Sequence, residues 1–262
     1  MQEDSSQHPV EYLADLLAEF GDYPDGVMPV PACITGVAFF PGGSGLWGAK
    51  MGQRLPPMPV GKVMALGHNF DSVAGYEISR VRGYERENSP TWGPLLKLLC
   101  TCDIAPEDCF FTNTYMGLKA DIHTSTGKNI STGPFPGAEN HSFVYRCRAF
   151  LLKQIRAQQP RLMLTLGEKV LPVLTPLAPG LTATWLGARH LADLDGSAAA
   201  LVYPVQFPGV PHSTAVVALT HPANRGPNVK RRSYNGQVGD AAECALVRDG
   251  LVACGLASQT HA

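Results

Sequence analysis

The sequence predicts a three-layer α/β fold, in which helices cover both faces of a central, mainly parallel sheet of four strands. Three observations predict this fold. Four short apolar runs recur along the chain, helical patterns lie between them, and each run ends in glycine, asparagine or histidine. Strands that alternate with helices form parallel sheets that are covered on both faces. The four run ends are therefore expected at one edge of the sheet.

The four apolar runs are short enough to be buried strands of a parallel sheet. They are KVMALG at 62–67, CFFTN at 109–113, RLMLTLG at 161–167 and AVVALTH at 215–221.

Helical patterns separate these runs. Ser89 and Pro90 are typical of a helix start, and residues 141–159 carry apolar side chains near one helical face. Pro172 and Pro176 limit the length of the helix that follows the third run. The expected helices cover residues 10–20, 89–100, 141–159, 167–177 and 240–256.

Composition indicates one globular domain. The chain has 262 residues, of which 45% are hydrophobic and 16% charged, so it can bury a sizeable core and is not typical of a disordered protein. We expect a single domain over residues 1–262, with a lead-in at 1–60, a core at 61–225 and a loop and C-terminal helix at 226–262. The net charge of −1 gives no overall positive field, so a nucleic-acid partner would have to meet a local basic patch.

Cysteine usage and the N-terminal segment predict a cytoplasmic protein. No apolar stretch reaches membrane-spanning length, and the acidic, polar segment MQEDSSQHPV is not a signal peptide. The seven cysteines form no CxxC pair, which indicates reduced thiols. Cys100, Cys102 and Cys109 match no zinc spacing. We expect neither a metal nor a cofactor.

Polar residues and glycines follow all four predicted strands. They are Gly67 with His68 and Asn69, then Asn113, Gly167 and His221. In open α/β sheets the ligand lies beyond the carboxyl ends of the strands. Each residue alone is explained as turn chemistry, because glycine, asparagine and His-Pro commonly end strands. The four ends together favour a site.

Four segments, in their order along the chain, resemble the uracil-DNA glycosylase superfamily. ALGHNFD at 65–71 looks like the first motif and THPANR at 220–225 like the third. Residues 91–113 and 147–170 resemble the helix–turn–strand blocks between them. The resemblance implies strand order 2-1-3-4 and a glycosylase-like core. Two departures are Phe70, where proline is usual, and Ala223, where serine is usual.

The resemblance implies that His221 and Asn69 are catalytic. His221 would donate a hydrogen bond to the leaving base, which becomes negative only as the glycosidic bond breaks, and Pro222 would fix the backbone after it. Asn69 would orient the attacking water. Asp71 is the alternative water partner, because Phe70 can shift the motif, and His68 is a third candidate.

The resemblance also implies that Asn113 recognises the base. A locked amide matches the N3–H donor and O4 acceptor of uracil, whereas cytosine presents the opposite pair. Gly67, His68 and Phe70 would complete the substrate pocket. Tyr84 is the predicted aromatic platform for the flipped base, with Tyr76 and Phe70 as alternatives and Trp92 assigned to the core. Residues 120–141 are expected at the pocket rim.

The segment after His221 would contact DNA. Its basic groups would neutralise phosphates, so binding should weaken with salt. Val229 and Tyr234 are the only apolar side chains it offers as a wedge, and a solvated surface loop is the alternative interpretation. The predicted DNA-binding residues are Asn224, Arg225, Lys230, Arg231 and Arg232.

We therefore predict a monomeric, monofunctional DNA glycosylase that hydrolyses the N-glycosidic bond of uracil, or of a related deaminated base, in base-excision repair. Its partner would be single- or double-stranded DNA, with no membrane involved. A non-catalytic relative that binds nucleic acid or a nucleobase is the first alternative. The second is a different hydrolase or nucleotide-binding enzyme on a similar sheet, although PGGSGLWG at 41–48 lacks the phosphate-loop pattern.

Overall fold

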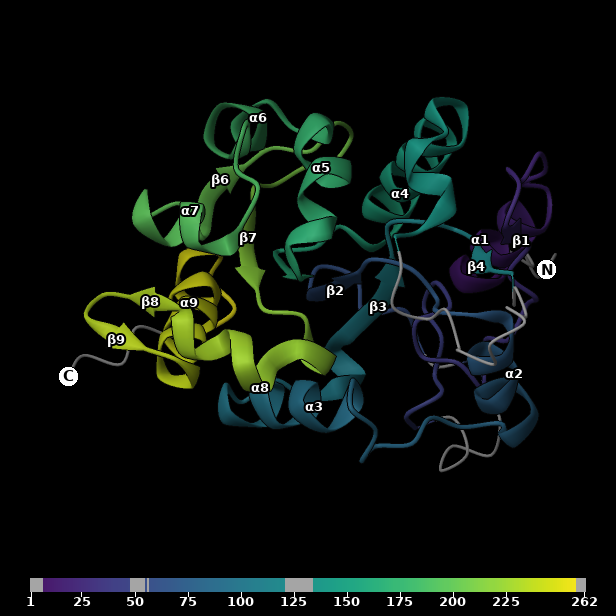
Figure 1. Ribbon diagram of the computed structural model, residues 1–262, viewed down its shortest axis with the longest axis horizontal. Coiled ribbons are helices and arrows are strands. Elements are labelled where there is room, and N and C mark those ends of the chain that lie inside the picture. The colour runs from purple at the N-terminus through teal and green to yellow at the C-terminus, as the bar shows by residue number, and fades with distance from the viewer. Residues whose placement is uncertain (1–6, 48–54, 56, 121–133, 258–262) are drawn as a thin grey trace, which may run out of the picture.

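The computed structural model describes residues 7–47, 55, 57–120 and 134–257. A five-stranded sheet with order β3-β2-β5-β7-β6 lies at its centre (Figure 1). The parallel strands are β2 (Val63–Gly67), β3 (Cys109–Asn113), β5 (Leu162–Leu166) and β7 (Thr214–Leu219). They are the four predicted strands, and the predicted order 2-1-3-4 is confirmed.

The fifth strand, β6 (Leu201–Val205), was not predicted. It pairs antiparallel with β7 at the sheet edge. Its sequence, LVYPV, contains a proline, which a central strand excludes and an edge strand tolerates. Its burial is partial, so the continuous apolar signal of the other four strands is absent.

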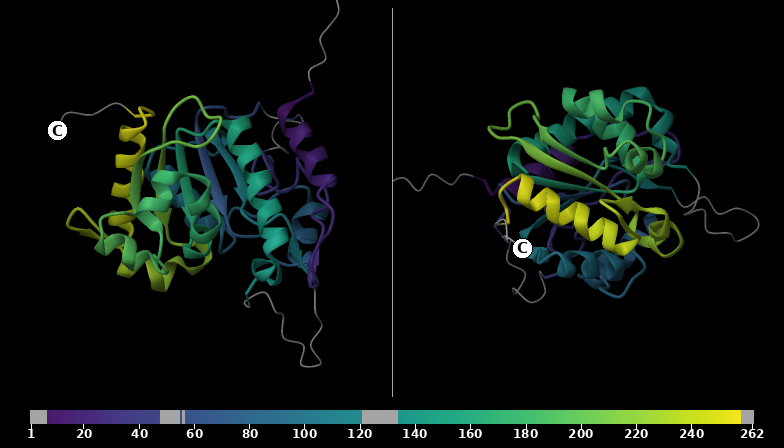
Figure 2. Two further views of the ribbon diagram at one scale, coloured as in Figure 1. Left: turned by 90° about the horizontal axis from the view of Figure 1, so that it is seen from above. Right: turned by 90° about the vertical axis from the view of Figure 1, so that its left-hand side faces the viewer.

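Helices cover the two faces of the sheet as expected. Adjacent residues of a strand point to opposite faces: the ring of Phe111 packs against Trp92 of α3 (Trp92–Thr101), whereas Thr112 donates a hydrogen bond to Gln154 of α4 (His141–Gln158). Figure 2 shows α3 and α9 (Asp240–Ala253) on one side and α4 and α5 (Leu171–Leu174) on the other.

Proline shortens the helix expected at 167–177. The structure divides this segment into a 3-10 turn at Glu168–Val170, the single turn α5 and a second 3-10 turn at Thr175–Leu177. Pro172 and Pro176 lack the N–H that a continuous helix needs at these positions.

The remaining elements are short. The helices are α1 (Pro9–Ala18), α2 (Val73–Arg82), α6 (Pro179–Trp185), α7 (Leu191–Gly196) and α8 (Arg225–Asn228). The two-residue strands are β1 (Val27–Met28), which pairs with β4 (Leu118–Lys119), and β8 (Ser233–Tyr234), which pairs with β9 (Gln237–Val238). Within the described ranges, no helix is both long and apolar enough to cross a bilayer.

Candidate active site

A cavity of about 1220 Å³ lies at the carboxyl edge of the sheet. It exceeds the usual size of a small-molecule pocket, so it can hold a nucleotide and part of its flanking strand. Residues from the ends of all four parallel strands line it: Gly67, Asn113, Gly167 and His221. The structure thus brings together the four run ends that the sequence singled out.

Asn113 forms the end of β3 and is buried, with an exposed fraction of 3%. It lies opposite Gly67 in the β2–β3 register, and a Cβ atom at Gly67 would come within 2.3 Å of Asn113 Oδ1. Gly67 therefore leaves the space that the Asn113 amide occupies. Asn113 Nδ2 is buried with no hydrogen-bond partner in the described part of the chain, so it is a donor that a ligand can satisfy.

The aromatic wall beside Asn113 is Phe39, which sequence reasoning missed. Phe39 lines the cavity, and its ring lies 4.9 Å from that of Trp92 and 5.6 Å from that of Phe111, between centroids. A Cβ atom at Gly67 would lie 3.2 Å from its ring edge. The available signal was the pair Phe39-Phe40 in a loop, of which Phe40 is fully buried.

The other aromatic residues predicted near the site differ in whether they line the cavity. Tyr84 is 48% exposed and does not line the cavity, so the structure does not support its prediction as the platform; Phe39 is an aromatic side chain that does line the cavity. Its ring packs instead under the guanidinium of Arg82, 5.6 Å from the ring centroid. Trp92 is a core residue, as expected, and also borders the cavity. Phe70 lines the cavity and packs edge-on against Tyr76.

His221 follows β7 and packs against Gly167. Gly167 has φ +98°, and a Cβ atom there would lie 3.0 Å from His221 Cβ, so glycine is required for this approach. Burial, and to a lesser extent the charge of Lys169, lowers the pKa of His221. The imidazole is therefore neutral at neutral pH. Its Nδ1 is buried without a partner among the described residues.

Asn69 and His68 form a hydrogen-bonded pair at the end of β2. His68 Nδ1 lies 2.8 Å from Asn69 Oδ1, so the neutral imidazole donates from Nδ1 and fixes the orientation of the amide. The pKa of His68 is lowered to about 4, mainly by burial; the hydrogen bond with Asn69 opposes this effect, and the charge of Lys169 adds to it. His68 also packs edge-on against Tyr115.

Asp71 is held by its backbone. It has φ +69°, a left-handed conformation that is uncommon for residues other than glycine. Ser72 then caps α2 by accepting from Gly75 N–H, and a Cβ atom at Gly75 would lie 2.7 Å from Asp71 Oδ2. The Asp71 carbonyl accepts from Lys119 N–H at 2.9 Å, and both side chains border the cavity. Burial lowers the pKa of Lys119, while the Asp71 carboxylate opposes that effect.

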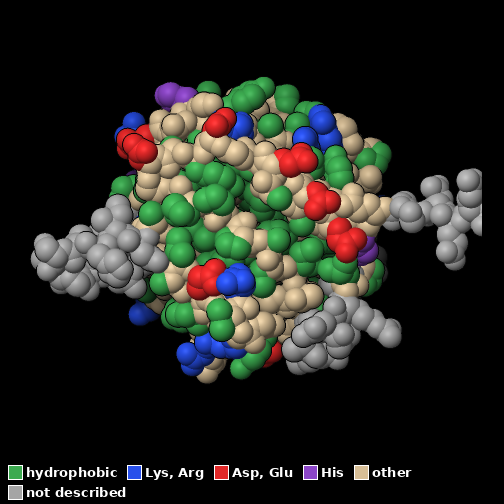
Figure 3. All heavy atoms as spheres, turned by 90° about the vertical axis from the view of Figure 1, so that its right-hand side faces the viewer, with side chains coloured by type: hydrophobic (Ala, Val, Ile, Leu, Met, Phe, Trp, Pro, Cys, Tyr) green, Lys and Arg blue, Asp and Glu red, His purple; other side chains and the backbone are tan. Residues whose placement is uncertain are grey.

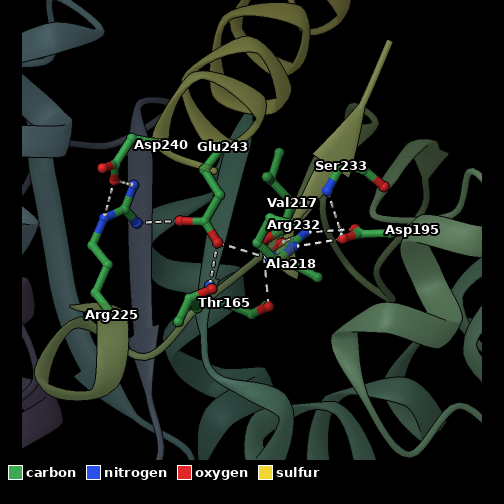
Figure 4. Close-up of polar contacts among 10 residues, drawn as sticks. Thr165, Asp195, Val217, Ala218, Arg225, Arg232, Ser233, Asp240 and Glu243 are labelled. Carbon is green, nitrogen blue, oxygen red and sulfur yellow. Dashed lines mark hydrogen bonds and ion pairs between the residues drawn. The ribbon is translucent and has the colours of Figure 1, made fainter. Parts of the chain in front are cut away.

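The loop after His221 is held by the buried carboxylate of Glu243 in α9 (Figure 4). Glu243 Oε1 accepts from Thr220 N–H at 2.6 Å and from Arg232 Nη1 at 2.8 Å, and its Oε2 accepts from Arg225 Nη1. Asp240 completes the pairing of Arg225. The carboxylate thus ties the residue before His221 to two points in the loop that follows.

The prediction that Arg225 and Arg232 bind DNA is therefore wrong. The Arg232 side chain is 2% exposed and also donates to both carboxylate oxygens of Asp195 and to the Ala218 carbonyl, at 2.9 Å each. Arg225 is buried between Glu243 and Asp240. Guanidinium groups engaged in buried ion pairs are not available to phosphates.

The other predicted DNA-binding side chains of this loop are exposed, so they are open to a ligand. Asn224 and Arg231 are exposed and line the cavity, and Lys230 is exposed beside them. Val229 is only 5% exposed, and Tyr234 donates its hydroxyl to Asp249 at 2.8 Å. Neither apolar side chain projects as a wedge.

Two further points concern the pocket rim and metal binding. Most of the segment expected at the pocket rim, residues 121–133, lies outside the described residues. Across the ranges that the structure describes, no group of three or more histidine, cysteine or acidic side chains could hold a metal ion.

The cavity at the carboxyl edge of the mainly parallel sheet thus combines an amide donor that has no partner among the described residues, an aromatic ring and a neutral histidine. The family model of the uracil DNA glycosylase superfamily matches residues 65–237. The chain belongs to this superfamily. No curated protein matches it. The match begins in β2, so Phe39 and the rest of residues 1–64 lie outside it.

Proposed function

We propose that the protein is a monofunctional DNA glycosylase that removes uracil, or a related deaminated base, from DNA. The observation that carries the proposal is the pair of buried nitrogens, Asn113 Nδ2 and His221 Nδ1, which have no partner among the described residues and belong to side chains that line one cavity. An unsatisfied buried donor costs about 1–3 kcal/mol. A base with acceptor oxygens would satisfy such groups on binding.

Base recognition follows from the geometry around Asn113. With the base stacked on Phe39, the Asn113 amide can donate from Nδ2 to O4 and accept from N3–H at Oδ1. Cytosine carries a donor where uracil carries O4, so it would face a second donor and leave groups unpaired. Gly67 contributes by leaving room for the amide.

Leaving-group stabilisation is assigned to His221. Bond cleavage makes the sugar oxocarbenium-like and the base anionic, so a donor aimed at the base acts more strongly on the transition state than on the substrate. A neutral imidazole is suited to donate one hydrogen bond without itself releasing a proton. Lys169 adds positive charge close enough to affect the pKa of His221, and this charge also favours the anion.

Water positioning is assigned to Asn69, with Asp71 as the alternative. Asn69 has a fixed orientation because His68 donates to its Oδ1, which retains a second lone pair for a water. Asp71 offers a full negative charge near the developing oxocarbenium ion. Asn69→Ala and Asp71→Asn, compared under single-turnover conditions, separate the two: the larger loss identifies the water-positioning residue.

The alternative function is a non-catalytic, base-binding member of the superfamily. Ala223 supports it, because it stands where the third motif usually has serine, and in the structure it is exposed at the cavity. This alternative shares the Asn113 pocket and the exposed side chains of Asn224, Lys230 and Arg231, which would contact DNA. It differs only in the fate of the glycosidic bond.

Excision assays distinguish the two functions. Single- and double-stranded oligonucleotides that contain one uracil, hypoxanthine or xanthine are incubated with the protein in the absence of metal, then treated with alkali. Strand breaks at the modified position are expected, at least for uracil. Binding to these oligonucleotides without any break would contradict the catalytic function and favour the base-binding alternative.

A further inference from the structure

An exposed apolar face on α2 borders the cavity. Ile78 is 57% exposed, Val81 78% and Tyr84 48%, which places three of the ten exposed large hydrophobic side chains of the described residues within one short segment. Ile78, Val81 and Arg82 have i, i+3, i+4 spacing and so share one side of the helix. Figure 3 views the side of the molecule on which α2 lies in Figure 1, and shows hydrophobic side chains at the surface beside charged ones.

This face is continuous with the proposed base pocket. Ile78 and Arg82 line the same cavity as Asn113 and His221. Arg86, four residues further along, also borders it. A ligand that occupies the cavity and extends beyond its mouth on this side would therefore contact α2.

Hydrogen bonds on the inner side of α2 and just after its C-terminal end hold the helix in place. On its inner side, Tyr76 donates its hydroxyl to the Pro31 carbonyl at 2.7 Å. At its end, Glu85 accepts from Ser79 Oγ at 2.9 Å and from Ala38 N–H at 3.1 Å, next to Phe39. These hydrogen bonds fix the position of α2 relative to the loop that carries Phe39.

The composition of the face fits DNA. Apolar side chains can enter a base stack and take the place of an extruded base, while adjacent arginines meet phosphates. Arg82 also lies over the ring of Tyr84, an arrangement that offers both a cation and a stacking surface. The loop after His221 offers no such wedge, because Val229 is buried.

We propose that the α2 face, formed by Ile78, Val81 and Arg82 of the helix and by Tyr84 just after it, inserts into the DNA stack beside the extruded base. The inference rests on the proposed function, because it requires that a base enters the cavity. It assigns duplex opening to the segment that follows the first motif, in place of the loop after His221.

The test uses the double variant Ile78→Ser/Val81→Ser, whose side chains are exposed, so that folding is retained. The uracil excision rate is measured under single-turnover conditions on one oligonucleotide sequence, as a single strand and as a duplex. A loss of roughly tenfold or more is expected on the duplex, where filling the gap offsets unstacking, and less than about twofold on the single strand, which has no stack to open. Val60→Ser is the matched control: Val60 is 52% exposed but precedes β2, at the opposite edge of the sheet.

The outcomes separate this inference from the proposed function. The inference is overturned if wild type and double variant excise uracil from the duplex at equal rates, or if the double variant loses activity equally on both substrates. Equal rates on the duplex would favour a protein partner for the α2 face. Excision by the wild type from single strands alone also overturns the inference. If the wild type cleaves neither substrate, the proposed function fails. Fluorescence of a 2-aminopurine placed next to uracil then still reports unstacking, and an increase with the wild type but not with the double variant supports the α2 face.

Discussion

Two groups of buried polar side chains meet at Thr220, and they differ in whether their hydrogen-bonding atoms have partners. Around Glu243, every carboxylate oxygen accepts from a cation or a backbone N–H. Around the cavity, Asn113 Nδ2 and His221 Nδ1 are buried and unpaired within the described residues. Thr220 belongs to both groups: its N–H donates to Glu243, its Oγ1 has no partner among the described residues, and the residue lines the cavity.

The difference separates structural from functional polarity. A fully paired buried network contributes rigidity and a unique arrangement of its segments, although its net stability is small. Unpaired buried groups cost stability and persist where a ligand completes them. Four other buried atoms in the described ranges are unpaired away from these groups, so an unpaired atom is informative only where it lines a cavity. The following predictions test this division.

The largest effect is expected at Glu243. Glu243→Ala leaves two buried guanidinium groups without their shared anion, and breaking a buried ion pair in this way costs about 3–5 kcal/mol of the free energy of unfolding. Urea unfolding measures the change. The control is Asp240→Asn, which affects the same Arg225 but at an exposed carboxylate, and should cost no more than about 1 kcal/mol. Equal losses would contradict the assignment of Glu243 as the centre of the network.

His221→Ala should show the reverse pattern. Loss of one preorganised donor lowers the excision rate by about 10²–10³-fold, whereas the free energy of unfolding should change by less than about 1 kcal/mol because no observed hydrogen bond is lost. Single-turnover kinetics and urea unfolding check the two parts. His190→Ala is the control at the same cavity, since His190 is exposed and pairs with Glu168. Full activity in His221→Ala would remove His221 from the mechanism.

Asn113→Asp should alter selectivity more than stability. Replacing the Nδ2 donor with an acceptor removes the match to uracil O4, so the preference for uracil over cytosine should fall by about 1–3 kcal/mol, or roughly 5- to 150-fold. Rates on matched uracil and cytosine oligonucleotides measure it. An unchanged preference would show that another group recognises the base.

The smallest effect concerns pH. The pKa of His68 is about 4 in the folded state and near 6.5 when unfolded, so below pH 6.5 the unfolded chain takes up its proton first. Stability should be constant above pH 6.5 and decrease below it, by about 1 kcal/mol between pH 6.5 and 5.5 from this group. His221 acts in the same direction. Urea unfolding of His68→Gln should show a smaller slope, and an unaltered slope would exclude His68 as its source.

Much of the site was predictable because it is encoded locally. Strand length, apolar continuity and the residue after each strand are short-range features, and they located Gly67, Asn113 and His221 at one edge of the sheet. Parallel pairing with helical crossovers then requires these ends to meet. The superfamily resemblance supplied the strand order, since periodicity alone does not fix which strands are neighbours.

The tertiary structure decided which equivalent side chains stay exposed. Arg231 and Arg232 are adjacent and chemically identical, and both line the cavity, yet Arg231 is exposed whereas Arg232 is 2% exposed because it pairs with Glu243 and Asp195. Phe39 forms the aromatic wall because an N-terminal loop packs across the cavity, and Tyr84 is left outside. The sequence by itself determined the four parallel strands of the sheet and the polar residues at their ends. Burial and charge pairing between distant segments selected, among similar residues, those available to a ligand.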